Sequence, residues 1–195
     1  TAQHITIRTF HALGALILHE AGEAIGLSPT FAICSEEDRR ALLKPILPDQ
    51  GEKVLNQRLA DLSTAKNALL LPDSPALADL FPGDEALRDL YSRYQAALRA
   101  NRLLDFDDLI LQTVQLFERE PLILQRYQER FRWLSVDEYQ DMNFAQYRLL
   151  RLLTPPTTNL CAIGDPDQAI YGFRGAKREY FQQFQADFPD ARLLP

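Results

Sequence analysis

Residues 131–141 read FRWLSVDEYQD and contain the stretch that decides the fold. The mainly apolar run from Phe131 to Val136 is too short for a helix, so we predict a buried strand over these residues. This strand ends directly at two adjacent carboxylates, Asp137 and Glu138. In an open parallel sheet, ligands bind beyond the carboxyl ends of the strands. The two acids are therefore predicted to face a ligand.

A second short strand is predicted at residues 159–163, and it ends in the same way at Gly164-Asp165. Between the two strands, Asn143 is expected to cap a helix that continues to Leu153. A strand, a helix and a second strand form a crossover that places the two strand ends close together. We therefore expect two acidic loops at one edge of one sheet.

Adjacent carboxylates at a strand end suit a nucleotide and its magnesium ion. Mg²⁺ keeps several waters and is usually held by one or two carboxylates together with substrate phosphates. In such a site Asp137 would hold the hydrated metal, and Glu138 would accept a proton from the attacking water. The alternative is a purely structural acidic loop that caps the helix beginning near Asn143. These residues alone leave both interpretations open.

Four stretches together carry a family resemblance: Thr9-Phe10-His11, LDFDDL at residues 104–109, DEYQD at 137–141 and GDPDQAIYGFRGA at 164–176. Their order and spacing resemble those of the UvrD/Rep-type DNA helicases over essentially the whole chain. The third stretch looks like the Walker B motif of that family, and the fourth looks like the helicase motif that follows it. The resemblance implies an α/β fold, mostly helical overall, in which an all-helical subdomain is inserted into a partial parallel sheet of a P-loop-type (RecA-like) ATPase core.

By this resemblance, residues 1–35 and 105–195 are expected to belong to the ATPase core, and residues 36–104 to the inserted helical subdomain. The Walker A pattern Gly-x-x-x-x-Gly-Lys-Ser/Thr does not occur in the sequence. We therefore expect an internal piece of the N-terminal motor half, following Walker A, that does not hydrolyse ATP alone. The remainder of the helicase chain is one expected partner.

The resemblance also implies roles for individual residues. Glu138 and Gln168 are the expected catalytic residues, with ATP and Mg²⁺ as cofactors. Asp137 is expected to hold the metal and, with Gln168, to contact the nucleotide. The amide of Gln168 offers both a donor and an acceptor to the terminal phosphate.

DNA contacts are implied for five residues, which are Thr9, His11, Tyr171, Phe173 and Arg174. Aromatic rings at 171 and 173 can stack on bases, and stacking is worth about 1–3 kcal/mol per base whatever the sequence. The expected activity is ATP-driven translocation on single-stranded DNA and unwinding at single-strand/duplex junctions, as in DNA repair, with 3′ to 5′ polarity. The alternatives are a non-catalytic binding module derived from a helicase, or the motor portion of a helicase-nuclease. For Thr9 the sequence also allows a simple helix N-cap.

Composition limits these interpretations. The 195 residues carry a formal net charge of -6, which argues against a binder that relies on a basic surface. No apolar stretch approaches the roughly 18 residues that a membrane span requires, so we expect a cytoplasmic protein without a membrane partner. Cys34 and Cys161 are far apart and lack the spacing of metal ligands, so both are predicted to be reduced core residues.

The rest of the chain predicts a strand over Gln3 to Arg8 and then mainly helices, at about residues 36–47, 52–70 and 84–102, with no further strand before Phe131. The first of these helices is expected to begin with a capping box at Ser35. The apolar stripe of the 52–70 helix is expected to be Val54, Leu55, Leu59 and Leu62.

Asp105, Asp107 and Asp108 are compatible with a metal site. We favour instead a helix start in which Asp105 is the N-cap. Arg39, Arg40 and Lys66 could reach phosphate, although solvated helix faces are the favoured interpretation.

Overall fold

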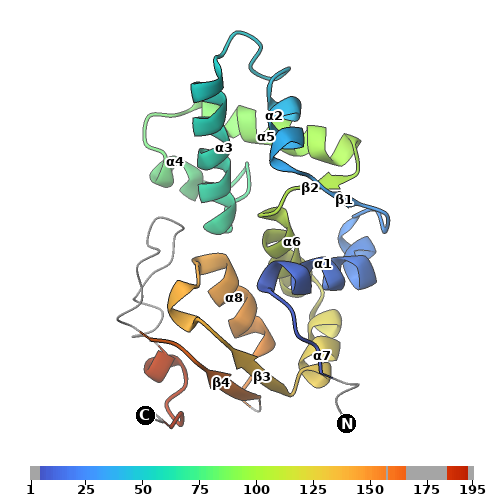
Figure 1. Cartoon of the computed structure of the whole chain (residues 1–195), viewed down its shortest axis with the longest axis vertical. Helices are drawn as coiled ribbons and strands as arrows, with labels where there is room; N and C mark the ends of the chain where they lie inside the picture. Colours follow the sequence, from blue (N-terminus) through green and yellow to red (C-terminus); the bar gives the residue numbers. More distant parts are fainter. Residues whose placement is uncertain (1–4, 157, 166–183, 193–195) are drawn as a thin grey trace. The chain divides into compact units, whose positions relative to one another are not determined.

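The structure is a computed structural model that describes residues 5–156, 158–165 and 184–192. It divides into two compact units, residues 1–123 and 124–195, each of which is treated by itself. Helices dominate, as predicted (Figure 1). The sheets in these ranges are two parallel strand pairs. The larger RecA-like sheet and the boundaries of the inserted subdomain stay predictions.

The first unit contains α1 (Phe10–Ala21), η2 (Gly22–Ile25), β1 (Ala32–Ile33), α2 (Glu36–Leu43), α3 (Glu52–Asn67), α4 (Ala76–Leu80), α5 (Ala86–Ala100), β2 (Leu103–Leu104) and α6 (Asp108–Arg119). Helix α7 (Pro121–Arg130) begins at the end of the first unit and continues into the second. The second unit also contains β3 (Trp133–Val136), η3 (Tyr139–Asp141), α8 (Phe144–Leu153) and β4 (Asn159–Ala162). None of the helices within the described ranges is long and apolar enough to cross a membrane.

Helix α1 packs against α6 (Figure 1). The predicted N-cap is confirmed, because the Thr9 hydroxyl accepts a hydrogen bond from the Ala12 N–H at 3.2 Å. The two helices lie close together at Gly14, where an added Cβ would lie 2.5 Å from the carbonyl oxygen of Leu109. Only glycine allows this approach without a shift of backbone.

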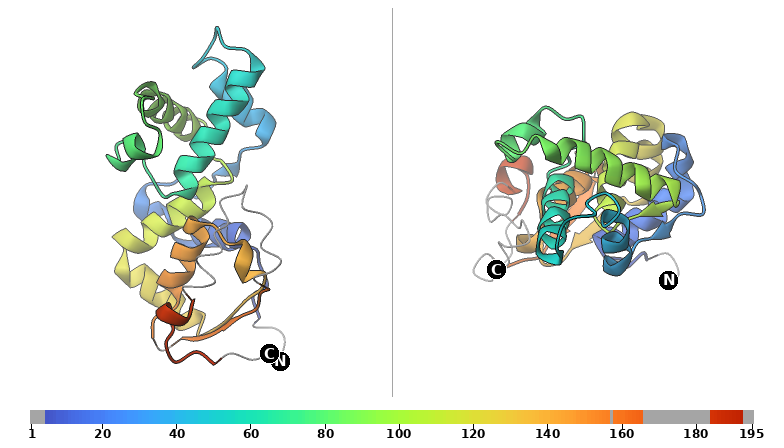
Figure 2. Two further views of the ribbon diagram at one scale, coloured as in Figure 1. Left: turned by 90° about the vertical axis from the view of Figure 1, so that its left-hand side faces the viewer. Right: turned by 90° about the horizontal axis from the view of Figure 1, so that it is seen from above.

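A second apolar cluster joins α2, α3 and α5 (Figure 2). The capping box predicted at Ser35 is present, since the Ser35 hydroxyl accepts from the Asp38 N–H and the Asp38 carboxylate accepts from the Ser35 N–H. Leu55, Leu59 and Leu62 line this cluster as predicted. Val54 does not, because it is 39% exposed, and the prediction for that residue was wrong.

Two strand predictions for the first unit were also wrong. Residues 5–8 form no strand, and the side chains of Ile5 and Ile7 are exposed. Alternating apolar residues form a strand only where a second segment pairs with them. No segment in the described part of the chain pairs with residues 5–8. Conversely, β1 pairs in parallel with β2 inside a region where no strand was expected.

In the second unit, β3 and β4 pair in parallel as predicted, with Val136 opposite Ala162. The predicted N-cap of α8 is confirmed, because the Asn143 side chain accepts from the Gln146 N–H. The prediction of a buried strand holds only for Val136, since Trp133 is 79% exposed. Both cysteines are free thiols, and Cys34 is buried as predicted.

Cys161 was predicted to lie in the core, but it is exposed on β4. The described pair of strands leaves much of its surface uncovered. Apolar side chains such as Trp133 and Cys161, which the sequence predicts to be buried, are therefore exposed to solvent.

The substitution Gly14→Ala should destabilise the first unit. The added methyl group would overlap the Leu109 carbonyl, and overpacking of this kind costs about 1–3 kcal/mol, which exceeds the helix-propensity gain of up to about 1 kcal/mol. Urea unfolding followed by circular dichroism measures the change. Gly51→Ser is the matched control, because nothing lies within 4 Å of a Cβ there. Equal midpoints for the two variants would contradict the close approach.

Candidate functional site

The ends of β3 and β4 bring the predicted acidic loops together. The Ile163 N–H donates to the Val136 carbonyl at 2.8 Å, and the Tyr139 N–H donates back to the Ile163 carbonyl at 2.9 Å. These bonds extend the pairing beyond the last residues of both strands. Asp137 and Glu138 therefore follow β3 at the same edge where Asp165 follows β4, as the sequence predicted.

Both carboxylates at the end of β3 are exposed to solvent. Glu138 has a left-handed backbone conformation, with φ of 52° and ψ of 44°. Such a conformation is uncommon for residues other than glycine and is often found at functional sites. The Asp137 carboxylate accepts a hydrogen bond from the Glu138 N–H at 3.0 Å. The backbone thus turns sharply between the two acids.

The structure decides against the capping alternative for these acids. Helix α8 has its own capping box, formed by Asn143 and Gln146. Neither Asp137 nor Glu138 is needed to satisfy the first turn of that helix. Capping of α8 therefore does not account for these two acids.

Gln140 is a further residue of this site that was not predicted from the sequence. Its side chain is buried, 2% exposed, and lies between the two strand ends. Its Nε2 donates to Glu138 Oε2 at 2.5 Å, and its Oε1 accepts from the Asp165 N–H at 3.0 Å. The available signal was a polar residue two positions after Glu138, but the sequence does not show that the η3 turn directs it between the strands.

The donor set at this edge fits a hydrated magnesium ion. Within the described ranges, no three His, Cys, Asp or Glu side chains are arranged to hold a metal by themselves. Mg²⁺ does not require such a set, because it is commonly held by one or two carboxylates, waters and substrate phosphates. An exposed Asp137 carboxylate meets that requirement. Gln168, Tyr171, Phe173 and Arg174 lie outside the described residues.

Thr9 and His11 lie in the first unit, at the start of α1. The imidazole of His11 stacks on the ring of Phe106, with ring centroids 3.7 Å apart and planes inclined by 20°. Phe106 is 50% exposed. Burial lowers the pKa of His11 to about 4, so its imidazole is neutral near pH 7. A contact of His11 with DNA would therefore use stacking or a neutral hydrogen bond, not a positive charge.

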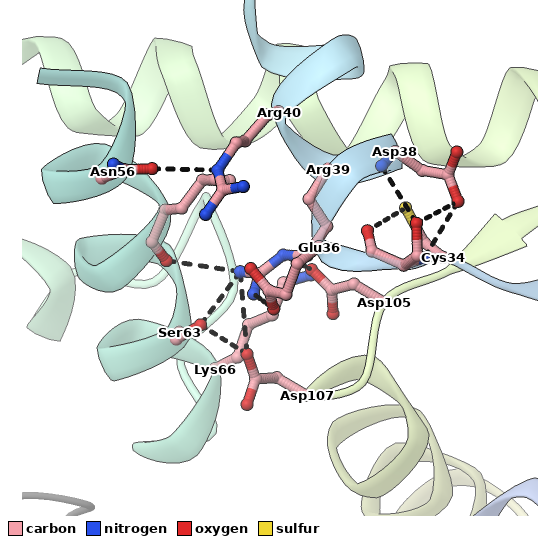
Figure 3. Close-up of polar contacts among 12 residues, drawn as sticks. Cys34, Glu36, Asp38, Arg39, Arg40, Asn56, Ser63, Lys66, Asp105 and Asp107 are labelled. Atoms are coloured by element: carbon pink, nitrogen blue, oxygen red, sulfur yellow. Dashed lines mark hydrogen bonds and ion pairs between the residues drawn. The ribbon is translucent and has the colours of Figure 1, made fainter. Parts of the chain in front are cut away.

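Asp105 and Asp108 form a buried ionic network with Lys66. Figure 3 shows Lys66 together with Asp105 and Asp107. Lys66 is fully buried, and its Nζ lies 2.6 Å from Asp105 Oδ2 and 3.0 Å from Asp108 Oδ1. The same ammonium lies 5.2 Å from the centroid of the Tyr94 ring. The prediction of a solvated helix face was therefore wrong for Lys66.

Arg39 was also predicted on a solvated face, but it is 5% exposed. Its guanidinium donates to Glu36 Oε1 at 2.7 Å, to Ser63 Oγ at 2.9 Å and to the hydroxyl of Tyr94 at 3.2 Å (Figure 3). Arg40 is exposed, as favoured, and donates to the Asn56 side chain. Arg39 faces the inside of the unit and Arg40 faces solvent. The sequence alone does not show which of the two adjacent arginines is buried.

Helix α6 begins at Asp108, with Asp107 as the preceding N-cap residue, so the prediction of Asp105 in that position was wrong. Asp105 still contributes to the helix start, because its carboxylate accepts from the Asp108 N–H at 3.0 Å. Asp107 accepts instead from the Ser63 hydroxyl at 2.6 Å and from the Asn67 amide at 3.0 Å. All three acids therefore serve structure, which agrees with the interpretation favoured over a metal site.

The pKa values of two of these carboxyl groups shift in opposite directions. Burial would raise the pKa of Asp105, but the charge and the hydrogen bond of Lys66, together with the charge of Arg39 and the Asp108 N–H, outweigh it and lower the pKa. Burial raises the pKa of Asp108 to about 6; the charge of Asp105 adds to this rise, and Lys66 only partly opposes it. The network thus contains one carboxylate that stays ionised and one that holds its proton to a higher pH.

Comparison with known proteins identifies relatives along nearly the whole chain. Residues 1–189 match the UvrD/REP helicase N-terminal domain. The ATP-dependent DNA helicase PcrA of Leuconostoc citreum is 42% identical over 198 residues, which cover 99% of this chain and 26% of the relative. The proteins of the same name from Staphylococcus aureus (strain Mu50) and Staphylococcus epidermidis are each 38% identical, over 99% of this chain and 27% of theirs. The chain spans about a quarter of the length of these relatives.

The substitution Lys66→Met should lower the free energy of unfolding by about 3–5 kcal/mol, because it removes the nearest cation of two buried carboxylates. Urea unfolding monitored by circular dichroism measures the loss. Lys53→Met, the same change at an exposed position of α3, should alter stability by no more than about 0.5 kcal/mol. A midpoint for Lys66→Met that matches the Lys53→Met midpoint would refute the energetic role of the pair.

The raised pKa of Asp108 predicts a pH dependence of stability. Between about pH 4 and pH 6 the folded chain holds a proton that the unfolded chain has released, so stability should fall as pH rises through this window. Asp108→Asn should flatten that part of the curve, measured as the free energy of unfolding in urea at half-unit steps of pH. Asp89→Asn, at an exposed position on α5, should leave the slope unchanged. A slope retained in Asp108→Asn would assign the proton elsewhere.

Proposed function

Because the chain belongs to the UvrD/REP helicase family, we propose that it forms part of the N-terminal motor half of an ATP-dependent DNA helicase. In this proposal the whole protein couples ATP hydrolysis to translocation on single-stranded DNA and to duplex unwinding, with 3′ to 5′ polarity. The relatives are named as ATP-dependent DNA helicases, which supports the reaction class. The rest of the motor would be supplied by sequence outside these 195 residues.

The observation that carries the proposal is the pairing of β3 with β4. It places Asp137 and Glu138 beside Asp165, the residue from which the chain continues toward Gln168. Exposed carboxylates that cap no helix, at the carboxyl end of parallel strands, suit a nucleotide better than a structural role. The arrangement therefore argues against a non-catalytic module.

The proposed chemistry divides between these side chains. Asp137 would hold the water shell of the magnesium ion that accompanies ATP, and the ion would offset phosphate charge. Glu138 would accept the proton of the attacking water as a general base. Gln168 would contact the terminal phosphate through its neutral amide. Together these roles describe ATP hydrolysis at the edge of the β3–β4 sheet.

DNA contact is proposed for the residues singled out by the family resemblance, namely Thr9, His11, Tyr171, Phe173 and Arg174. The stack between His11 and the half-exposed ring of Phe106 adds support at α1, because base stacking uses accessible aromatic faces. The Thr9 hydroxyl already accepts from Ala12, but its own O–H can still donate to a phosphate. Such contacts suit single strands and their junctions with duplex.

The test of the proposal is Glu138→Gln in the full-length protein. Without the carboxylate no base accepts the proton, so kcat for single-strand-stimulated ATP hydrolysis should fall by about 10²–10⁴-fold. The Michaelis constant for ATP should stay nearly unchanged, because the amide keeps the shape of the side chain. A coupled assay of phosphate release, with and without single-stranded DNA, measures both constants.

Glu129→Gln is the matched control, since that exposed carboxylate on α7 accepts only from neighbouring Gln125 in the described contacts. It should leave kcat at the wild-type value. Normal turnover in Glu138→Gln would remove the catalytic assignment. Absence of hydrolysis in the full-length wild-type protein would favour the non-catalytic binding module instead.

A further inference from the structure

Gln140 is a buried polar side chain whose two ends are occupied by different segments. Its Nε2 donates to Glu138 Oε2 at 2.5 Å, and its Oε1 accepts from the Asp165 N–H at 3.0 Å. The orientation of the amide is fixed by chemistry, because a backbone N–H can only donate and must face the oxygen. The nitrogen is therefore directed at the carboxylate.

This contact restrains a side chain that would otherwise rotate. Glu138 is exposed, and a glutamate in water has several accessible rotamers. The hydrogen bond from Gln140 selects one of them, and the left-handed backbone at Glu138 fixes the direction in which the side chain leaves the chain. The buried amide has no alternative partner in water, so breaking the bond would leave a donor unsatisfied.

We propose that Gln140 is a positioning residue that holds the Glu138 carboxylate in its working orientation and joins it to the backbone at Asp165. The inference rests on the proposed function, because it deepens the role given there to Glu138. Asp165 lies three residues before Gln168 in the sequence. Gln140 thus links the general base to the start of the stretch that would sense the phosphate.

Glutamine is suited to this position by both length and polarity. Glutamate has the same length and can accept from the Asp165 N–H, but it cannot donate to a second carboxylate at pH 7. Methionine has a similar length and neither strong donor nor strong acceptor. The two replacements therefore separate the bond to Glu138 from the bond to Asp165.

The experiment measures kcat and the Michaelis constant for ATP in the full-length protein carrying Gln140→Met or Gln140→Glu. A misoriented base should lower kcat by about 10–100-fold in both variants, while the Michaelis constant changes by less than about threefold. Gln128→Met is the matched control, because Gln128 donates only to the Leu152 carbonyl in the described contacts. It should keep the wild-type kcat. Thermal unfolding establishes that each variant is folded, and Gln140→Glu decides alone if Gln140→Met does not fold.

A double-mutant cycle distinguishes positioning from a general structural effect. Gln140→Met should cause no further loss of residual kcat in a protein that already carries Glu138→Gln, because no base remains to be oriented. An equal fold-loss in both backgrounds, or a wild-type kcat in Gln140→Glu, would overturn the inference. Normal turnover in Glu138→Gln would instead refute the proposed function. An inactive Glu138→Gln combined with fully active Gln140 variants would refute the positioning role alone.

Discussion

The ion pairs of Lys66 are the interaction on which the first unit depends. A buried ammonium loses its hydration, and the loss is offset only when good partners surround it. Lys66 has two carboxylates within 3.0 Å and the face of the Tyr94 ring nearby. Its partners are Tyr94 on α5, Asp105 in the segment before α6 and Asp108 at the start of α6, whereas Lys66 itself belongs to α3. One charge therefore fixes the relative positions of three parts of the chain.

The same network determines where Phe106 lies. Asp105 and Asp108 are held by Lys66, and Asp107 is held by Ser63 and Asn67. With the acids on both sides held by side chains of α3, the ring between them remains half-exposed and stacks on His11. The acidic segment thus serves α6 and the helical block on one side and presents an aromatic ring on the other. An apolar replacement of the network could match its stability, but it would not give the segment this two-sided order.

Sequence patterns predicted the features that are decided locally. Hydroxyl and amide caps at Thr9, Ser35 and Asn143 satisfy backbone groups within one turn, so the residue types alone indicate them. Features that depend on distant partners were not predictable in this way. Lys66 and Lys53 lie on one helix with the same charge, and only tertiary packing makes one of them buried. The strand expected near Ile5 is absent and the β1–β2 pair was not expected, and both differences have the same cause. A strand forms only where a second segment pairs with it, and the local sequence does not show that segment.

The candidate site shows the same division between local and distant information. Acids after an apolar run indicated where β3 would end, and parallel pairing with β4 follows from the crossover between them. Gln140 could not be found from periodicity, because it lies in a 3₁₀ helix of three residues, which is too short to show a periodic pattern. Its two hydrogen bonds connect the loop that follows β3 to the loop that follows β4. Parallel pairing brings the loops near each other, but a side chain that bonds to both sets the orientation of the carboxylate between them. Sheet topology thus determines which residues meet, and the buried amide determines how they face.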